Sequence, residues 1–339
     1  MYLKRREVLT EACKQAEALG MCYRPLGSKE RRSLLAVSPD VTGMRPQDGL
    51  EGAPRFVRVG RNLYMRRETW ESMSPDELML SVIKTHASFN PDWVFSHYSA
   101  ALLHRLDVSY QLLDQIHIAC PLSSKSQSTP EVRRHFAARE GSVKANGVRC
   151  TTLEETLLGC MCLAPFEFSL GIVDSAIRMR RTSAKRLGVY FEVHGKNRRR
   201  ILRAREALKY ADGRAENGGE SHARAVMIEE GFAPHRLQVE FDDPFDLGRN
   251  IRGNFGWELE DGRWIIGELD GKGKYIDPGM LGDRGMQDVL LEERLRESRL
   301  SAYGVKIMRF PYSYVLDRSK LVGLMQIYGV PRSEIPLIP

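Results

Sequence analysis

Residues 263–275 (RWIIGELDGKGKY) are the segment of this chain that most restricts both its fold and its chemistry. The apolar residues at its start predict a buried strand, and side chains alternate along a strand, so Glu268 and Asp270 are expected on one face. Glycines then end the strand, and the following loop returns Lys274 toward the two acids. Two carboxylates beside an ammonium group can hold Mg²⁺ or Mn²⁺ and stabilise a phosphoryl transition state. A solvated strand end with an Asp-Gly turn explains the same residues, and both interpretations stay open.

The elements predicted around this strand follow the order helix, three strands, helix, strand. Asn217 or Gly218 can cap the first helix, and Gly231 ends it. Strand-like runs follow at about 236–242, 252–258 and 263–270. A charged helix is expected over 284–303, a last buried strand over 305–310 and a closing helix over 312–327. This order predicts an α/β (α+β) chain and is the αβββαβ core order of the restriction-endonuclease-like fold.

A resemblance to a known family rests on several short pieces in the same order. Residues 216–311 resemble the PD-(D/E)XK nuclease branch related to very-short-patch-repair endonucleases, and the matching pieces are 219–221 with Arg224, 234–238, 254–257, 267–271 with 274–275, and 293–297 with 299–300. The whole chain resembles two-part actinobacterial proteins whose front half is similar to AbiEi-type antitoxins. The Ser-His-x-Ser-Ala-Ala element at 96–101 carries that second resemblance.

The nuclease resemblance implies roles for four residues. Glu220 would orient a metal-bound water, Glu268 and Asp270 would bind Mg²⁺ or Mn²⁺, and Lys274 would stand near the scissile phosphate. The implied reaction is hydrolysis of a DNA phosphodiester by a water whose pKa the metal lowers.

Asn254 departs from the family pattern, which has an aspartate there as the main metal ligand. An amide oxygen can touch a cation but brings no negative charge, so the affinity for Mg²⁺ should fall. The unit is then a degenerate nuclease that only grips DNA, or Glu258 or Glu260 substitutes as a ligand, or activity persists at a low level. We favour degeneration.

Length and composition predict a soluble protein of two or three domains. The 339 residues are 42% hydrophobic and 28% charged, and no apolar run approaches the length of a membrane span. The start lacks the hydrophobic segment of a signal peptide, so we expect a cytoplasmic protein. The six cysteines form no CxxC pair, and Cys160 and Cys162, in the apolar stretch 156–163, are expected as buried thiols. The predicted regions are 1–85 (winged-helix-like), 86–210 (AbiEi-like α+β) and 211–339 (nuclease-like).

Basic residues gather in one part of the sequence. The net charge is +7, and from Arg178 to Arg205 there are eleven Lys or Arg residues against the single acid Glu192. Helical spacing places two sets on common faces, and these sets are Arg178, Arg181 and Lys185, and Lys196, Arg199, Arg200 and Arg203. Such clusters suit DNA phosphates, while a solvated helical surface is the alternative.

The front half predicts a hairpin at 55–65, which resembles the wing of a winged helix and would present Arg58 and Arg61 to DNA. A plain structural hairpin is the alternative. One helix is expected over 70–89, with Pro75-Asp-Glu as an internal start, and Ser96 is expected to cap the next. His97 and His104 share a face of that helix, but we interpret them as cap and packing residues because the sequence pairs them with no third ligand.

Three functions compete on this sequence. The first is a metal-dependent DNA endonuclease, which Asn254 weakens. The second is a non-enzymatic regulator of the antitoxin type that binds DNA. The third is a module that recognises a toxin protein.

Overall fold

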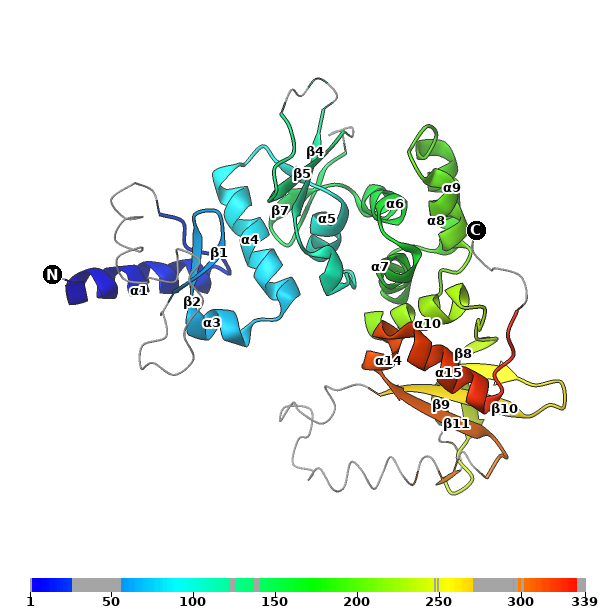
Figure 1. Cartoon of the computed structure of the whole chain (residues 1–339). Helices are drawn as coiled ribbons and strands as arrows, with labels where there is room; N and C mark the ends of the chain where they lie inside the picture. The colour runs from blue at the N-terminus through cyan, green and yellow to red at the C-terminus, as the bar shows by residue number, and fades with distance from the viewer. Residues whose placement is uncertain are drawn as a thin grey trace. The chain divides into compact units, whose positions relative to one another are not determined.

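The computed structural model of the chain describes residues 2–25, 56–121, 123, 126–136, 141–246, 248, 250–270, 295, 298–299 and 302–333. The chain divides into two compact units, Met1–Cys160 and Met161–Pro339. Both units combine helices with sheets, so the predicted α+β class is confirmed (Figure 1). No helix in the described ranges combines the length and the apolar character that crossing a membrane requires.

The first unit begins with a helix and the predicted hairpin. Helix α1 (Tyr2–Ala18) precedes strands β1 (Phe56–Gly60) and β2 (Leu63–Arg66), which pair antiparallel. Two helices follow, α3 (Arg67–Ser72) and α4 (Pro75–Phe89), so the segment 70–89 is not one helix, but α4 begins at the predicted internal start Pro75. Pro75 disfavours helical backbone in the residue before it, and Ser74 and Glu77 form a capping box that starts α4 anew.

A five-stranded sheet forms the rest of the first unit. Its strand order is β5-β4-β3-β7-β6. The strands are β3 (Val94–Phe95), β4 (Ile116–Cys120), β5 (Val132–Phe136), β6 (Val143–Ala145) and β7 (Val148–Cys150), and the helices are α5 (His97–Leu103), the 3₁₀ turn η2 (Tyr110–Leu112) and α6 (Leu153–Leu163). All five residues of β4 are buried, as expected for an interior strand. Ser96 precedes α5 as predicted, but its side chain does not cap the helix, and its Oγ lies 3.1 Å from His97 Nδ1.

The second unit begins with four helices and continues with a four-stranded sheet. The helices are α7 (Phe166–Arg178), α8 (Ala184–His194), α9 (Ile201–Leu208) and α10 (Gly218–Glu229). The strands are β8 (Arg236–Asp242), β9 (Asn250–Glu258), β10 (Trp264–Asp270) and β11 (Lys306–Pro311), in the spatial order β11-β10-β9-β8. Strands β8, β9 and β10 pair antiparallel, whereas β10 and β11 pair parallel. The four predicted strands are therefore confirmed, and the helix predicted over 284–303 lies largely outside the described residues.

Helices α14 (Tyr312–Leu316) and α15 (Arg318–Tyr328) stand where one closing helix was predicted, because the backbone of Asp317 leaves the helical region. The larger core joins α10, α14 and α15 to one face of the sheet (Figure 1) and includes Met227, Trp257 and Phe310, each at most 1% exposed. Val239, Ile251, Ile266 and Val305 form a smaller core. These cores fix where α10 meets the sheet.

Candidate functional site

The first turn of α10 holds Glu220 in a buried position. The Asn217 side chain caps the helix by accepting a hydrogen bond from the Glu220 backbone nitrogen at 3.0 Å. Glu220 is only 5% exposed, and the positive end of the helix dipole favours a carboxylate there. The predicted cap and the predicted place of Glu220 at the start of the helix therefore agree with the structure.

The Glu220 carboxylate accepts hydrogen bonds from four donors within the described residues. Oε2 accepts from the Glu216 backbone nitrogen at 2.8 Å and from Gln238 Nε2 at 3.1 Å. Oε1 accepts from Asn217 Nδ2 at 3.1 Å and from Asn254 Nδ2 at 3.3 Å. Hydrogen bonds of this kind stabilise the ionised carboxylate in the way that a cation otherwise would.

Asn254 on β9 joins Glu220 to the neighbouring strand β10. Its Oδ1 accepts a hydrogen bond from the Leu269 backbone nitrogen at 3.0 Å. A backbone N–H can only donate, so this contact fixes the orientation of the amide and directs Nδ2 toward Glu220. The Asn254 amide thus makes two hydrogen bonds, one to Glu220 of α10 and one to the backbone of β10.

Gln238 reaches Glu220 because of an irregularity in β8. Its backbone has φ +51°, in the left-handed region, and it lies between the registered pairs Leu237↔Phe255 and Val239↔Gly253. Leu237 packs in the larger core and Val239 in the smaller one, whereas regular alternation would place both on one face. The irregularity therefore turns the strand at the point where Gln238 contacts the carboxylate.

The two carboxylates predicted on β10 have separate surroundings. Asp270 accepts from Arg309 of β11, with Oδ1 2.6 Å from Nη2 and 3.0 Å from Nε. Glu268 is 7% exposed, and a Cβ atom placed on Gly253 would lie 3.4 Å from its Oε1. Lys274, the predicted phosphate partner, lies outside the described residues.

These side chains do not fit the Mg²⁺ or Mn²⁺ site that the sequence suggests. The described residues contain one group of three His, Cys, Asp or Glu ligand atoms within 4.8 Å of one another, and Glu220, Glu268 and Asp270 are not part of it. Amide and backbone donors occupy Glu220, and an arginine pairs with Asp270. Hard divalent cations need several free oxygen ligands, and this arrangement directs an N–H group of Asn254, not an oxygen, toward Glu220.

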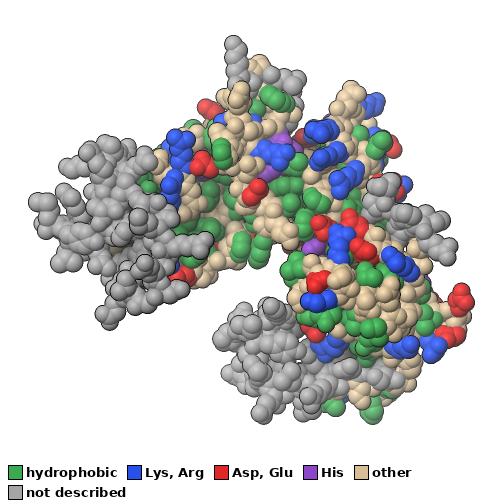
Figure 2. All heavy atoms as spheres, viewed as in Figure 1, with side chains coloured by type: hydrophobic (Ala, Val, Ile, Leu, Met, Phe, Trp, Pro, Cys, Tyr) green, Lys and Arg blue, Asp and Glu red, His purple; other side chains and the backbone are tan. Residues whose placement is uncertain are grey.

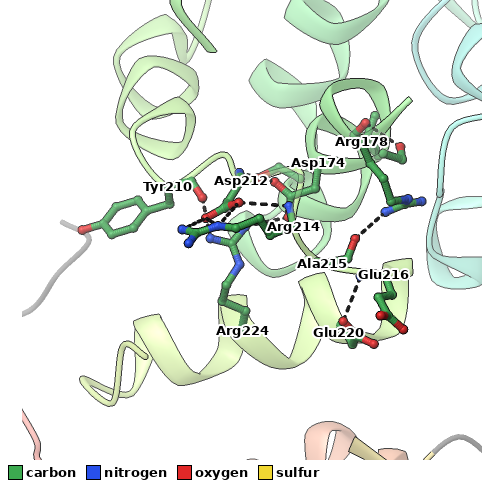
Figure 3. A network of polar contacts seen from close by, with 12 residues as sticks. Asp174, Arg178, Tyr210, Asp212, Arg214, Ala215, Glu216, Glu220 and Arg224 are labelled. Atoms are coloured by element: carbon green, nitrogen blue, oxygen red, sulfur yellow. Dashed lines mark hydrogen bonds and ion pairs between the residues drawn. The ribbon is translucent and has the colours of Figure 1, made fainter. Parts of the chain in front are cut away.

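A buried ion pair holds α10 against α7 (Figure 3). Arg224 Nη2 lies 2.6 Å from Asp174 Oδ2, and the two side chains are 6% and 0% exposed. Arg224 also donates to the Tyr210 carbonyl at 2.6 Å, and Asp174 accepts from the Asp212 backbone nitrogen at 2.7 Å. Burial raises the pKa of Asp174, and the Arg224 guanidinium opposes that rise. The network ties the helix that carries Glu220 to the segment that follows α9.

Of the basic residues predicted to contact DNA in the segment 178–203, one is half-buried and the others are exposed. Arg178 is half-buried, and its Nη1 donates to the Ala215 carbonyl at 3.0 Å (Figure 3). The others are exposed on or beside α8 and α9, and they are Arg181, Lys185, Lys196, Arg199, Arg200 and Arg203. Figure 2 shows Lys and Arg side chains gathered over these two helices. Arg178 therefore stabilises the fold, while the others form an exposed basic surface.

The hairpin arginines of the first unit are both exposed. Arg58 Nε donates to the Gly60 carbonyl of its own hairpin at 3.2 Å. Arg61 lines a small pocket together with His86 and Glu131. Their contact with DNA stays a prediction.

Sequence reasoning missed Gln238 as a partner of Glu220, and it missed His117 and His135, which lie beside His97 in the first unit. The only sequence signal for the Gln238 contact is a weak one, a glutamine inside an apolar strand. No signal in the sequence spacing joins the three histidines, because strand pairing brings them together.

Comparisons with known proteins give a distant likeness only. No protein-family model matches the chain. Two proteins from two strains of Mycobacterium tuberculosis, both described as uncharacterized, are 32% identical to it over 166 residues. The match covers 46% of this chain and 57% of each relative, so the chain spans little more than half the length of the curated relatives it matches.

Proposed function

We propose that this chain is a DNA-binding protein whose nuclease-like unit grips DNA without cutting it. The observation that carries the proposal is the exposed basic surface of α8 and α9. Lys185, Lys196, Arg199 and Arg200 are exposed there, and no ion pair in the described ranges involves them. Cations that are free of acidic partners are available to phosphates, and phosphate contacts dominate DNA affinity.

The surroundings of Glu220 support the second half of the proposal. Its carboxylate receives donors from Asn254 and Gln238, where a nuclease would need open metal ligands. These donors stabilise the carboxylate without a cation, which supports a polar centre at this place over an open metal site. A metal-dependent nuclease is the competing function, and it is tested below.

The binding test measures affinity for a random-sequence DNA duplex by fluorescence anisotropy over a range of salt concentrations. A plot of the logarithm of the DNA-binding constant against the logarithm of salt concentration has a negative slope. Removing three phosphate contacts in the variant Lys185→Gln/Lys196→Gln/Arg199→Gln should reduce the magnitude of that slope by about 3. The matched control Lys144→Gln/Lys306→Gln/Lys320→Gln removes the same charge from exposed positions elsewhere. Equal losses in both variants would show general charge attraction and would reject the assigned surface.

The cleavage test uses supercoiled plasmid with Mg²⁺ or Mn²⁺. We expect no nicking by the wild-type protein, with the Glu268→Ala/Asp270→Ala variant as the matched background. Nicking that this double variant loses would contradict the proposal and establish the nuclease. Cleavage gained by Asn254→Asp alone would identify Asn254 as the residue that silences the unit.

A further inference from the structure

Three histidines from different parts of the first unit meet on one side of its five-stranded sheet. His117 lies on β4 and His135 on β5, and these parallel strands pair with Ala119 opposite His135. The two histidines therefore lie diagonally on the same face of the sheet. His97 begins α5 directly after β3, the other neighbour of β4.

The three imidazoles are close enough to share one ion. One ligand atom of each lies within 4.8 Å of those of the other two. His117 Nδ1 is 2.9 Å from His135 Nε2, and the rings of His97 and His135 stack with centroids 3.6 Å apart. Ligands bound to Zn²⁺ at about 2.0–2.1 Å in a tetrahedron lie roughly 3.4 Å apart, so small side-chain rotations would gather these nitrogens around a metal.

His117 is the most buried member of the cluster. His117 is 1% exposed, and its Nε2 is buried with no hydrogen-bond partner in the part of the chain that the structure describes. A buried polar atom without a partner costs about 1–3 kcal/mol. Nδ1 of the same ring faces His135 Nε2, so a cation bound at Nδ1 would leave Nε2 as the protonated nitrogen.

The surroundings hold His97 in a strained and confined position. Its backbone has φ +47°, in the left-handed region, which non-glycine residues adopt mainly where the structure imposes it. Gly159 of α6 leaves room for the ring, because a Cβ atom at that position would lie 3.0 Å from His97 Nε2. The ring is thereby held between α6 and His135.

The protonation of the cluster is compatible with metal binding. Burial lowers the pKa of His117 to about 3 and that of His135 to about 4, and the charge of Arg133 contributes to both shifts. Both imidazoles are neutral at neutral pH, the form that ligates metals. Arg133 is exposed, so solvent screens its repulsion of a cation.

We propose that His97, His117 and His135 form a binding site for a divalent transition-metal ion, with Zn²⁺ as the best fit. Three neutral imidazoles suit zinc and its neighbours, whereas Mg²⁺ and Ca²⁺ take oxygen ligands. Three protein nitrogens leave a fourth position for water or another small ligand. The site is independent of the acids on β10 and of the DNA-binding surface.

The test begins with full-length protein that has been stripped by a chelator and dialysed against Zn²⁺. We expect one tightly bound zinc per chain by elemental analysis and a thermal midpoint that rises with Zn²⁺ but not with Mg²⁺. Substituted Co²⁺ should show the visible absorption of a four-coordinate ion without a thiolate charge-transfer band. No bound zinc and no midpoint shift in the wild-type protein would overturn the proposal, whatever any variant does.

Two conservative variants then locate the site. His97→Asn keeps a residue that tolerates left-handed backbone, and His135→Gln lies on the edge strand β5, so both should fold. Each of these two variants should lower the affinity for zinc at least about 10-fold, because the loss of a residue that only hydrogen-bonds to a metal ligand already lowers metal affinity by that factor. His194→Gln, an exposed histidine of α8, and Glu268→Ala/Asp270→Ala should retain full stoichiometry. Wild-type affinity in both cluster variants would show that zinc binds elsewhere and would reject the site.

Discussion

Asn254 Nδ2 donates to Glu220 Oε1 at 3.3 Å while Asn254 Oδ1 accepts from the Leu269 backbone nitrogen at 3.0 Å. An aspartate in the same place could accept from Leu269 but would direct a second negative charge at Glu220. Aspartate and asparagine at position 254 therefore favour opposite surroundings. Two neighbouring carboxylates would favour a cation, whereas the asparagine amide supplies a hydrogen-bond donor to Glu220.

The substitution Asn254→Asp should make the stability of the protein depend on metal. Without divalent ions the variant loses one hydrogen bond and gains like-charge repulsion, which should lower the free energy of unfolding by about 1–3 kcal/mol. Millimolar Mn²⁺ should restore part of this loss in the variant and leave the wild-type midpoint unchanged. Asn254→Ala is the control, because it removes the hydrogen bonds without adding charge. Our interpretation would be refuted if Mn²⁺ raised the thermal midpoint of the wild-type protein but not that of the Glu268→Ala/Asp270→Ala variant.

Removing one member of the Asp174–Arg224 pair should be among the most damaging single changes in the second unit. Asp174→Ala leaves a buried guanidinium without its partner, and such changes typically cost about 3–5 kcal/mol. The double variant Asp174→Ala/Arg224→Met should cost less than the sum of the two single variants, and denaturant melts of all three measure the difference. Asp261→Ala breaks an exposed pair with Arg263 and should leave the denaturation midpoint unchanged. Additive losses would show that the two side chains do not interact.

His86 should make the first unit less stable in mild acid. Burial and the charge of Arg24 lower its pKa from 6.5 in the folded chain. As the pH falls, the unfolded chain therefore binds a proton at His86 before the folded chain does. The contribution of His86 to the free energy of unfolding is complete above the pKa of the unfolded chain, and it is lost as the pH falls from that value toward the lower pKa of the folded chain. The slope is at most about 1.4 kcal/mol per pH unit for one proton. Urea melts between about pH 7.5 and 5.5 should show a shallower pH dependence for His86→Gln than for wild type. Equal slopes for the two proteins would exclude His86 as a source of the effect.

The regular parts of the second unit could be predicted from local pattern, and its polar centre could not. Apolar runs and turn residues indicated β8, β9 and β10, and Asn217 indicated the start of α10, because these signals lie within a few neighbouring residues. The contact of Gln238 with Glu220 depends on left-handed backbone inside a strand, and strict alternation does not predict it. The histidine cluster depends on which strands pair and in which register, and those facts are set by tertiary packing.

The contact between α7 and α10 determines where this protein can be divided. A fragment that begins at residue 211, the boundary that the sequence suggested, keeps Arg224 and loses Asp174 together with the buried face of α7. A fragment of residues 161–339 retains both. We expect cooperative thermal unfolding and a soluble yield from the longer fragment, and aggregation from the shorter one. The smallest part of the second unit that folds independently should therefore include α7, which precedes the sheet and α10 in the sequence.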